Sequence, residues 1–359
     1  MRFSNYCWCL LLVCMLFWVA APGARAQTRP SLALRFSAGQ PTLYLTGDAG
    51  SVYSIQYATD LSSTSVWVER SLLQAEGAGK FWTDPTAPAP AQGFYRAVSV
   101  KAPADHNLVF IQPGTFMMGS PTNEAERGLD EVQHQVTLST GFWIERYLVT
   151  QGGYLSVVGT NPSHFQPPTV ALDLTRPVEE VTWLNATNYC ALRTQQEQAG
   201  GLIPTNFVYR LPTESEWEYA CRAGTIGAFY LGSGLYSQQA NFDGHFEYEA
   251  ASGTLYDASG IQLGATTPVG SFAPNSLGLY DMIGNVLEWC QDFYGPYPLG
   301  SVVDPQGAVS DLNRLVRGGF WFGAGRLCRS AARAHSAPQI RSSNLGFRVV
   351  LAPAPPGPL

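Results

Sequence analysis

Glycine and proline interrupt this 359-residue chain too often for a helical bundle or for long regular strands. It contains 36 glycines and 25 prolines, and few stretches show the apolar spacing of a helix. Hydrophobic residues make up 45% and charged residues 13%, so the chain can still bury a sizeable core. Because the length exceeds that of one ordinary domain, we expect two domains of short strands, turns and ordered loops.

The first 26 residues have the pattern of a cleaved signal peptide. Arg2 gives a positive start, residues 7–21 are apolar, and residues 24–26 offer small side chains for cleavage. A retained anchor is the alternative, but the apolar run is shorter than the roughly 20 residues of a membrane-spanning helix. A lipoprotein site at Cys14 is disfavoured by the bulky Val13 before it. The sequence therefore predicts a periplasmic or extracellular protein with no membrane span after cleavage.

The charge of the chain argues against some partners. The formal net charge is −6, and removal of the predicted leader, which has no acidic residue, makes it more negative. No basic run interrupts this acidic character. We therefore expect no nucleic acid partner and no attraction to anionic membranes.

Residues 27–100 are expected to form a small all-β module. Apolar side chains alternate with polar or small ones in residues 32–36 and again in residues 53–57, as on strands with one buried face. The pattern is similar to the fibronectin-III-like modules of secreted bacterial proteins. Large aromatic residues could fill a sandwich core or, alternatively, form a carbohydrate platform; they are Trp67, Phe81, Trp82, Phe94 and Tyr95.

Residues 101–106 form a predicted linker to a second domain over residues 107–351, and a proline-rich tail covers residues 352–359. Two helices are predicted in the second domain. One begins near Thr182. The other has a capping box, with Thr213 as N-cap and Glu216 three residues later, and ends at Gly224.

Several segments of this second domain resemble the formylglycine-generating enzyme (sulfatase-modifying factor) family in order and spacing. These segments are residues 113–120, 142–151, 176–179, 209–220, 267–270, 275–289, 317–319 and 344–348. Each is a weak signal alone, but their common order over most of the domain is specific. The resemblance implies an α+β fold related to C-type lectins, with little regular secondary structure.

The resemblance also implies an activity, and the residues for it are missing. Active members bind copper(I) through two cysteines after an Arg-Gly-Gly segment and use oxygen to convert a sulfatase cysteine to formylglycine. Thiolates suit this soft metal. Here Phe320 replaces a serine, Gly323 replaces the first cysteine, and the shortened segment has no counterpart of the second. Cys328 lies too late and is a single sulfur, so we expect no bound copper.

Family resemblance further implies structural calcium. One site would use the side chains of Asp281 and Glu288 with the carbonyls of Gly284 and Val286, and oxygen ligands of this kind suit a hard cation. Hydrogen bonds within the loop are the alternative role for the two carboxylates. A second family site matches in its first half only; Asn241 and the carbonyl of Phe242 are in place, and Asp257 is the nearest acidic candidate.

Four cysteines follow the predicted leader, and their spacing alone permits three disulfide pairings. The family forms a disulfide between the position of Cys221 and one within two residues of Cys328, so the resemblance implies a Cys221–Cys328 bond. Cys190 and Cys290 would pair by elimination or remain buried thiols.

Aromatic and arginine residues follow the former catalytic position and are predicted to line a ligand cleft. Residues of these types are frequent at binding hot spots; here they are Phe320, Trp321, Phe322, Arg326, Arg329, Arg333 and His335. The alternative is that the aromatic residues belong to the core and that the arginines form internal ion pairs.

Other chemistry has weak support in the sequence. The five histidines have no metal-ligand spacing, and a carboxylate pair for acid–base chemistry could come from Asp292, Glu288 and Glu180 only if folding brings them together. The preferred hypothesis is an exported binding or accessory module for a peptide, a glycan or an envelope partner. The rivals are an active enzyme with a rearranged site and a purely structural envelope protein.

Overall fold

The computed structural model describes residues 29–37, 39–62, 64–85 and 93–354. The chain divides into two compact units. The first comprises residues up to Arg70 together with Ala75–Ser99, and the second comprises Ser71–Gln74 together with the residues from Val100 onward. The predicted signal peptide and the last five residues of the predicted tail lie outside the described residues.

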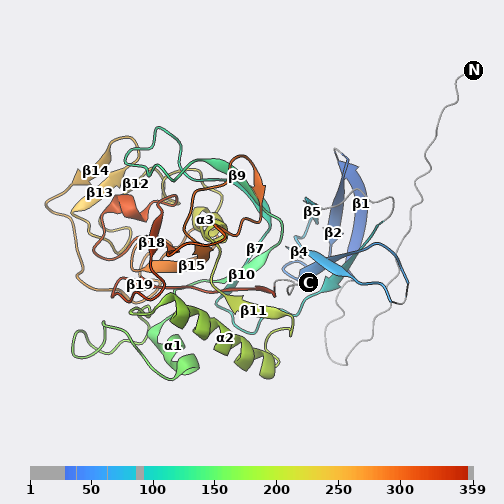
Figure 1. The fold of residues 1–359 in the computed structure, drawn as a ribbon, viewed down its shortest axis with the longest axis horizontal. Helices are drawn as coiled ribbons and strands as arrows, with labels where there is room; N and C mark the ends of the chain where they lie inside the picture. The colour runs from blue at the N-terminus through green and yellow to red at the C-terminus, as the bar shows by residue number, and fades with distance from the viewer. Residues whose placement is uncertain (1–28, 38, 63, 86–92, 355–359) are drawn as a thin grey trace, which may run out of the picture. The chain divides into compact units, whose positions relative to one another are not determined.

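Antiparallel strands make up the first unit (Figure 1). One sheet has the order β1-β2-β5, and another has the order β4-β3-β6. Their bounds are β1 Ser31–Ser37, β2 Gln40–Thr46, β3 Val52–Ala58, β4 Val68–Gln74, β5 Lys80–Thr83 and β6 Phe94–Ser99. This agrees with the expectation of an all-β module.

The core of the first unit differs in part from the predicted one. Tyr53 and Ile55 on β3 are buried as expected, and so is Trp82 on β5. Phe36 is exposed, as are most of the side chains of β1. Phe81 is also exposed and packs against Tyr44 and beneath the Arg35 guanidinium, so it contributes little to the core.

The second unit has three helices among its described residues, and short strands and loops make up the rest (Figure 1). The helices are α1 Gln151–Val158, α2 Trp183–Ala199 and α3 Glu214–Arg222, and Gly325–Cys328 forms one 3₁₀ turn. This is an α+β fold with little regular secondary structure, as the resemblance implied.

The strands of this unit form four small sheets, which are joined by loops. Their orders are β11-β20-β10-β7, β18-β17-β15-β19, β16-β9-β8 and β12-β13-β14. The strand bounds are β7 Leu108–Ile111, β8 Gly114–Met118, β9 His134–Leu138, β10 Phe142–Glu145, β11 Phe207–Arg210, β12 Gly234–Leu235, β13 Phe246–Glu249, β14 Gly253–Tyr256, β15 Leu287–Phe293, β16 Val302–Val303, β17 Arg314–Arg317, β18 Ala334–Ser336, β19 Leu345–Gly346 and β20 Val350–Pro353. Strand β20 extends past the predicted domain end, because Ala352 and Pro353 pair with β11. The predicted tail therefore starts two residues too early.

Capping boxes distinguish the two helices that were predicted from the sequence from the one that was not. Thr182 and Thr213 cap α2 and α3, and each has a complete capping box. At the end of α3, Ala223 takes the left-handed conformation next to the predicted Gly224. Helix α1 was not predicted. It is short, contains Gly152 and Gly153, and has only two buried side chains, so it shows no apolar stripe.

Buried ion pairs hold the loops of the second unit around α3. Arg317 on β17 is fully buried and donates to Glu214 and Glu218 on the helix, at 3.2 Å for Glu214. Glu218 also accepts from Arg222 at 2.8 Å and from the backbone N–H of Gly119 at 2.9 Å. These bonds fix the N-terminal end of α3, where a pocket opens. Among the described residues, no helix has the length and apolar character that crossing a membrane requires.

Candidate functional site

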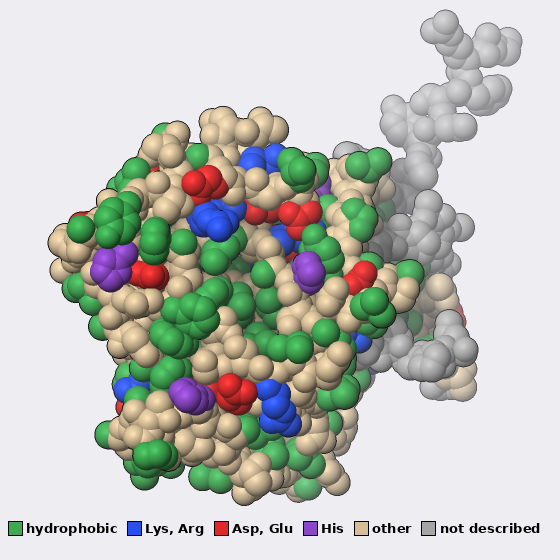
Figure 2. All heavy atoms as spheres, turned by 60° about the vertical axis from the view of Figure 1, so that its left-hand side comes forward, with side chains coloured by type: hydrophobic (Ala, Val, Ile, Leu, Met, Phe, Trp, Pro, Cys, Tyr) green, Lys and Arg blue, Asp and Glu red, His purple; other side chains and the backbone are tan. Residues whose placement is uncertain are grey.

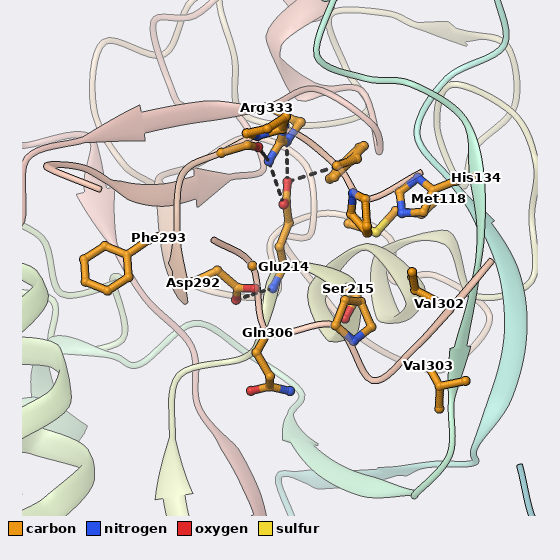
Figure 3. A pocket seen from close by; sticks show the side chains of 16 residues that line it. Met118, His134, Glu214, Ser215, Asp292, Phe293, Val302, Val303, Gln306 and Arg333 are labelled. Carbon is orange, nitrogen blue, oxygen red and sulfur yellow. Dashed lines mark hydrogen bonds and ion pairs between the residues drawn. The ribbon is translucent and has the colours of Figure 1, made fainter. Parts of the chain in front are cut away.

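The candidate site is a pocket of about 350 Å³ in the second unit, between the start of α3, the end of β15, strand β9 and the loop that contains β16. Its walls combine Met118, Val302, Val303 and several prolines with a few polar side chains. Figure 3 shows His134 and Met118 together on one side and Glu214 with Asp292 toward the other. Small-molecule sites commonly have this size and this mainly apolar lining.

Glu214 begins α3 and lies at the base of the pocket. Both of its carboxylate oxygens are engaged by Arg333, which donates from Nε at 2.7 Å and from Nη2 at 2.9 Å. Tyr297 and Arg317 also donate to Oε1, at 3.1 and 3.2 Å. Such a fork fixes the arginine and neutralises the glutamate, so this pair shapes the pocket without offering it a free charge.

Asp292 lies near the end of β15, and its Oδ2 accepts the backbone N–H of Glu214 at 2.8 Å. Burial, reinforced by the negative charge of Glu214, raises the pKa of Asp292 to about 8. Asp292 is therefore mainly protonated at neutral pH and can donate a hydrogen bond. The sequence suggested Asp292, Glu288 and Glu180 as a possible carboxylate pair for acid–base chemistry. Of these three, Asp292 alone lines this pocket, and Glu288 pairs instead with Arg348.

Replacing Asp292 by Asn is expected to stabilise the protein at alkaline pH. The folded-state pKa lies above the ordinary value of 3.8, so the folded state holds a proton that the unfolded chain loses from about pH 4 upward. The unfolding free energy therefore falls as pH rises from 4 to 8, by at most about 1.4 kcal/mol per unit. The amide introduced by Asp292→Asn can still accept the Glu214 N–H but cannot titrate.

Thermal unfolding at pH 5 and pH 8 tests this. Asp292→Asn should raise the melting temperature more at pH 8 than at pH 5, where only the first part of this loss of stability has occurred. Asp311→Asn is a matched control, because Asp311 is exposed and also accepts a backbone N–H, from Asn313 at 2.7 Å. If Asp292→Asn raised the melting temperature by the same amount at both pH values, burial would not perturb the titration of Asp292.

His134 on β9 contributes a further polar group to the pocket. Its Nδ1 lies 3.0 Å from the carbonyl oxygen of Val132, and its ring packs 4.6 Å from that of Tyr297. The side chain is buried, and Nε2 has no hydrogen-bond partner. Buried polar atoms without a partner are uncommon and costly in folded proteins.

The residues of the predicted cleft do not share one site. Arg333 alone of the set lines this pocket. Arg329 is buried and binds Glu124 at 2.6 Å and both oxygens of Glu131 at 2.7 and 2.8 Å, so assigning it to a cleft was wrong. Arg326 lies on the surface, and exposed His335 packs its ring 4.3 Å from that of Tyr294.

The three aromatic residues of the predicted cleft form a separate cluster with Phe165. The Phe322 ring lies 4.5 Å from both Phe320 and Trp321, and Phe165 lies 5.4 Å from Trp321. Phe322 is 43% exposed, and the Trp321 indole donates to the Ser343 carbonyl at 3.2 Å. Figure 2 shows apolar side chains gathered in the middle of one face, with separate charged side chains around them.

The residues of the first calcium prediction lie together at the turn before β15. Asp281 and Glu288 are both buried. Glu288 accepts from Arg348 at 2.6 and 3.0 Å, and Asp281 accepts the Gly270 N–H at 2.7 Å. Gly284 has φ +78°, and a side chain there would clash with the Asn241 carbonyl. Arg348 thus pairs with the Glu288 carboxylate and reaches only the backbone carbonyl of Asp281, at 3.3 Å, so both carboxylates have hydrogen-bond partners within the protein.

The second predicted calcium site has only part of its expected set of metal ligands. Asn241 is buried and donates to the Ala265 carbonyl at 3.0 Å, while its Oδ1 has no hydrogen-bond partner. Asp257 instead accepts from the backbone and side chain of Ser259, at 2.9 and 2.7 Å. In the described part of the chain, no group of three histidine, cysteine, aspartate or glutamate side chains is placed to hold a metal.

Each of the four described cysteines is a buried free thiol. Cys221 and Cys328 belong to one hydrophobic cluster, but the structure does not show the bond predicted between them. Burial raises the pKa of each to about 12. Reactive cysteines need a thiolate and some exposure, and neither residue has them.

Comparison with known proteins identifies the second unit. The family model for the sulfatase-modifying factor enzyme 1-like domain matches residues 96–353, which is more than half of the chain. The chain belongs to this family. The match covers the candidate pocket, the aromatic cluster and the predicted calcium residues.

The relatives of this chain include proteins named as enzymes and one named as a chaperone. The chain is similar to the formylglycine-generating enzyme of Streptomyces coelicolor, at 35% identity over 48% of this chain and 51% of that protein. It is also similar to the chaperone protein LppX of Paenibacillus barcinonensis, at 34% identity over 60% of this chain and 78% of that one. The chain spans about half the length of the formylglycine-generating enzymes it matches.

A solved structure confirms the fold of this family member. PvdO from Pseudomonas aeruginosa superposes with a TM-score of 0.55 and 29% identity, covering 70% of this chain and 99% of that one. The sequence resemblance therefore identified the family and fold correctly. It did not identify the pocket, since Glu214, His134 and Asp292 come from separate segments; the capping box at α3 was the one local signal near it.

Proposed function

We propose that this chain is an exported, calcium-stabilised binding module of the sulfatase-modifying factor family that does not carry out copper-dependent cysteine oxidation. The proposal depends chiefly on one observation: after Arg317-Gly318-Gly319, glycine (Gly323) replaces the first cysteine of active members, and the second cysteine has no counterpart. The leader pattern supports export, and the buried Asn241 Oδ1, which has no hydrogen-bond partner, supports calcium at the second predicted position.

Packing around Gly323 supports the loss of the first thiol position. A side chain at Gly323 would begin 3.1 Å from the Phe320 ring, closer than an ordinary van der Waals contact. A cysteine at this position would therefore crowd the Phe320 ring, which would have to shift by a few tenths of an ångström. Cys328 does not compensate, because it is buried beneath Gly319, where an added Cβ would clash with its Sγ.

The cluster of Phe165, Phe320, Trp321 and Phe322 supports a binding role for the same region. Its rings make edge-to-face contacts, which hold them in a fixed arrangement. Fixed, partly exposed aromatic side chains lose little conformational entropy when they bind a partner. We propose this aromatic cluster as the surface that contacts a peptide or glycan ligand.

An oxidation assay tests the proposal. The mature protein is incubated with copper(I), oxygen, a reductant and a sulfatase-derived cysteine peptide, and the peptide is analysed by mass spectrometry. We expect no aldehyde, while a family member with both cysteines, run in parallel, should convert the peptide. Conversion by this chain above a copper-only blank would contradict the proposal and favour an enzyme with a rearranged site.

A further inference from the structure

We propose that the pocket beside α3 binds a small uncharged ligand with an apolar ring and a hydroxyl group that donates a hydrogen bond to His134 Nε2. This site is separate from the aromatic cluster and from the predicted calcium residues. It does not depend on the oxidase activity or on its loss.

The size and walls of the pocket fit a single ring. Its volume of about 350 Å³ is at the small end of the range for organic ligands. Met118, Val302 and Val303 provide apolar walls, and Figure 3 shows the two valines on the His134 side of the pocket. Burial of a ring against such side chains is favourable by about 25 cal/mol per Å² of apolar surface.

The hydrogen-bonding role of His134 follows from its backbone contact. A carbonyl oxygen can only accept, so Nδ1, which lies 3.0 Å from the Val132 oxygen, carries a proton. In the neutral ring Nε2 is then an acceptor, and it has no partner in the structure. A ligand hydroxyl would supply the missing donor once neighbouring side chains shift, because Nε2 has almost no accessible surface in this structure.

The charged groups that line the pocket favour an uncharged ligand. Glu214 and Arg333 satisfy each other in a two-point ion pair, and Arg333 also donates to the carbonyl of Gly295 at 2.9 Å. Asp292 is mainly protonated at neutral pH because burial raises its pKa to about 8. A charged ligand would therefore lose its hydration without finding a free partner of opposite charge.

A pair of probes tests this inference. The affinities of p-cresol and toluene are measured by isothermal titration calorimetry on the full mature chain at pH 7. The probes share a ring and a methyl group and differ by the hydroxyl. We expect p-cresol to bind about fivefold more tightly than toluene, since one hydrogen bond to a buried acceptor contributes about 1 kcal/mol.

Variants assign the difference to His134. In His134→Asn the amide nitrogen can keep the bond to Val132, but nothing replaces Nε2, so the preference for p-cresol should disappear. His245→Asn is the matched control, because His245 lies outside the pocket and bonds Asp243, and it should keep the preference. Val302→Trp fills the pocket and should abolish binding of both probes.

The outcomes are distinguishable. Equal affinities of the two probes for the wild-type protein, or a preference for p-cresol that persists in His134→Asn, would overturn the inference. So would the absence of any p-cresol binding at millimolar concentration. The wild-type comparison decides the question even if His134→Asn does not fold. An active oxidase in the peptide assay would leave this site unaffected, so failure of one proposal is separable from failure of the other.

Discussion

Replacing Arg329 by Met should lower the unfolding free energy by about 3–5 kcal/mol, the usual cost of leaving a buried charge without its partner. Arg329 is 3% exposed and is the shared partner of Glu124 and Glu131, which are themselves buried. Methionine fills a similar volume, so the loss reports on charge and hydrogen bonding more than on packing. Urea unfolding followed by tryptophan fluorescence measures the effect.

Arg326→Met is the matched control for this change. Arg326 lies three residues away and was predicted to share the same cleft, but its side chain is 48% exposed and lies 3.9 Å from Glu126. Exposed pairs contribute about 0–1 kcal/mol, so this variant should unfold almost like the wild type. Similar losses in both variants would contradict the assignment of Arg329 as a structural ion-pair centre.

Arg348→Met should destabilise the second unit by a similar amount, about 3–5 kcal/mol. Arg348 is fully buried, binds both oxygens of Glu288 at 2.6 and 3.0 Å, and donates to the carbonyls of Glu145 and Tyr280 at 3.1 and 2.9 Å. The substitution removes the guanidinium donor from the Glu288 carboxylate and from these carbonyls. Three segments distant in sequence therefore lose their common partner.

This variant should be unfolded in a chelating buffer so that no cation can substitute for the guanidinium beside Glu288. Arg341→Met provides the comparison, because Arg341 is exposed and makes one bond, to the Glu180 carbonyl at 3.0 Å. We expect its unfolding midpoint to match that of the wild type. If Arg348→Met also matched the wild type, the Glu288 pair would not be a determinant of the fold.

The sequence was sufficient for the family and for features with local signals. Thr213 and Glu216 lie three residues apart, so their capping box could be recognised directly, and the helix follows it. Helix α1 gave no such signal, because its two glycines and exposed side chains resemble a loop. Phe36 alternated as a core residue should, but most of its strand is exposed, and the alternation alone does not reveal this.

The site could not be predicted because its contacts join distant segments. Arg329 pairs with Glu124 across 205 positions, and Arg333 pairs with Glu214 across 119. An arginine-rich segment therefore has the same pattern whether its side chains face a ligand or a buried carboxylate. The unsatisfied Nε2 of His134 is likewise a property of packing, and nothing near position 134 indicated it.

Metal content of the purified mature protein tests the central claim most directly. The protein is offered copper(I) under reducing conditions and calcium in excess, desalted and analysed by elemental mass spectrometry. We predict stoichiometric calcium and no retained copper, because the cysteines that remain are buried and the family's thiol pair is absent. Copper retained tightly at one per chain would contradict this, since it would require a soft-metal site and would restore the oxidase as the leading function.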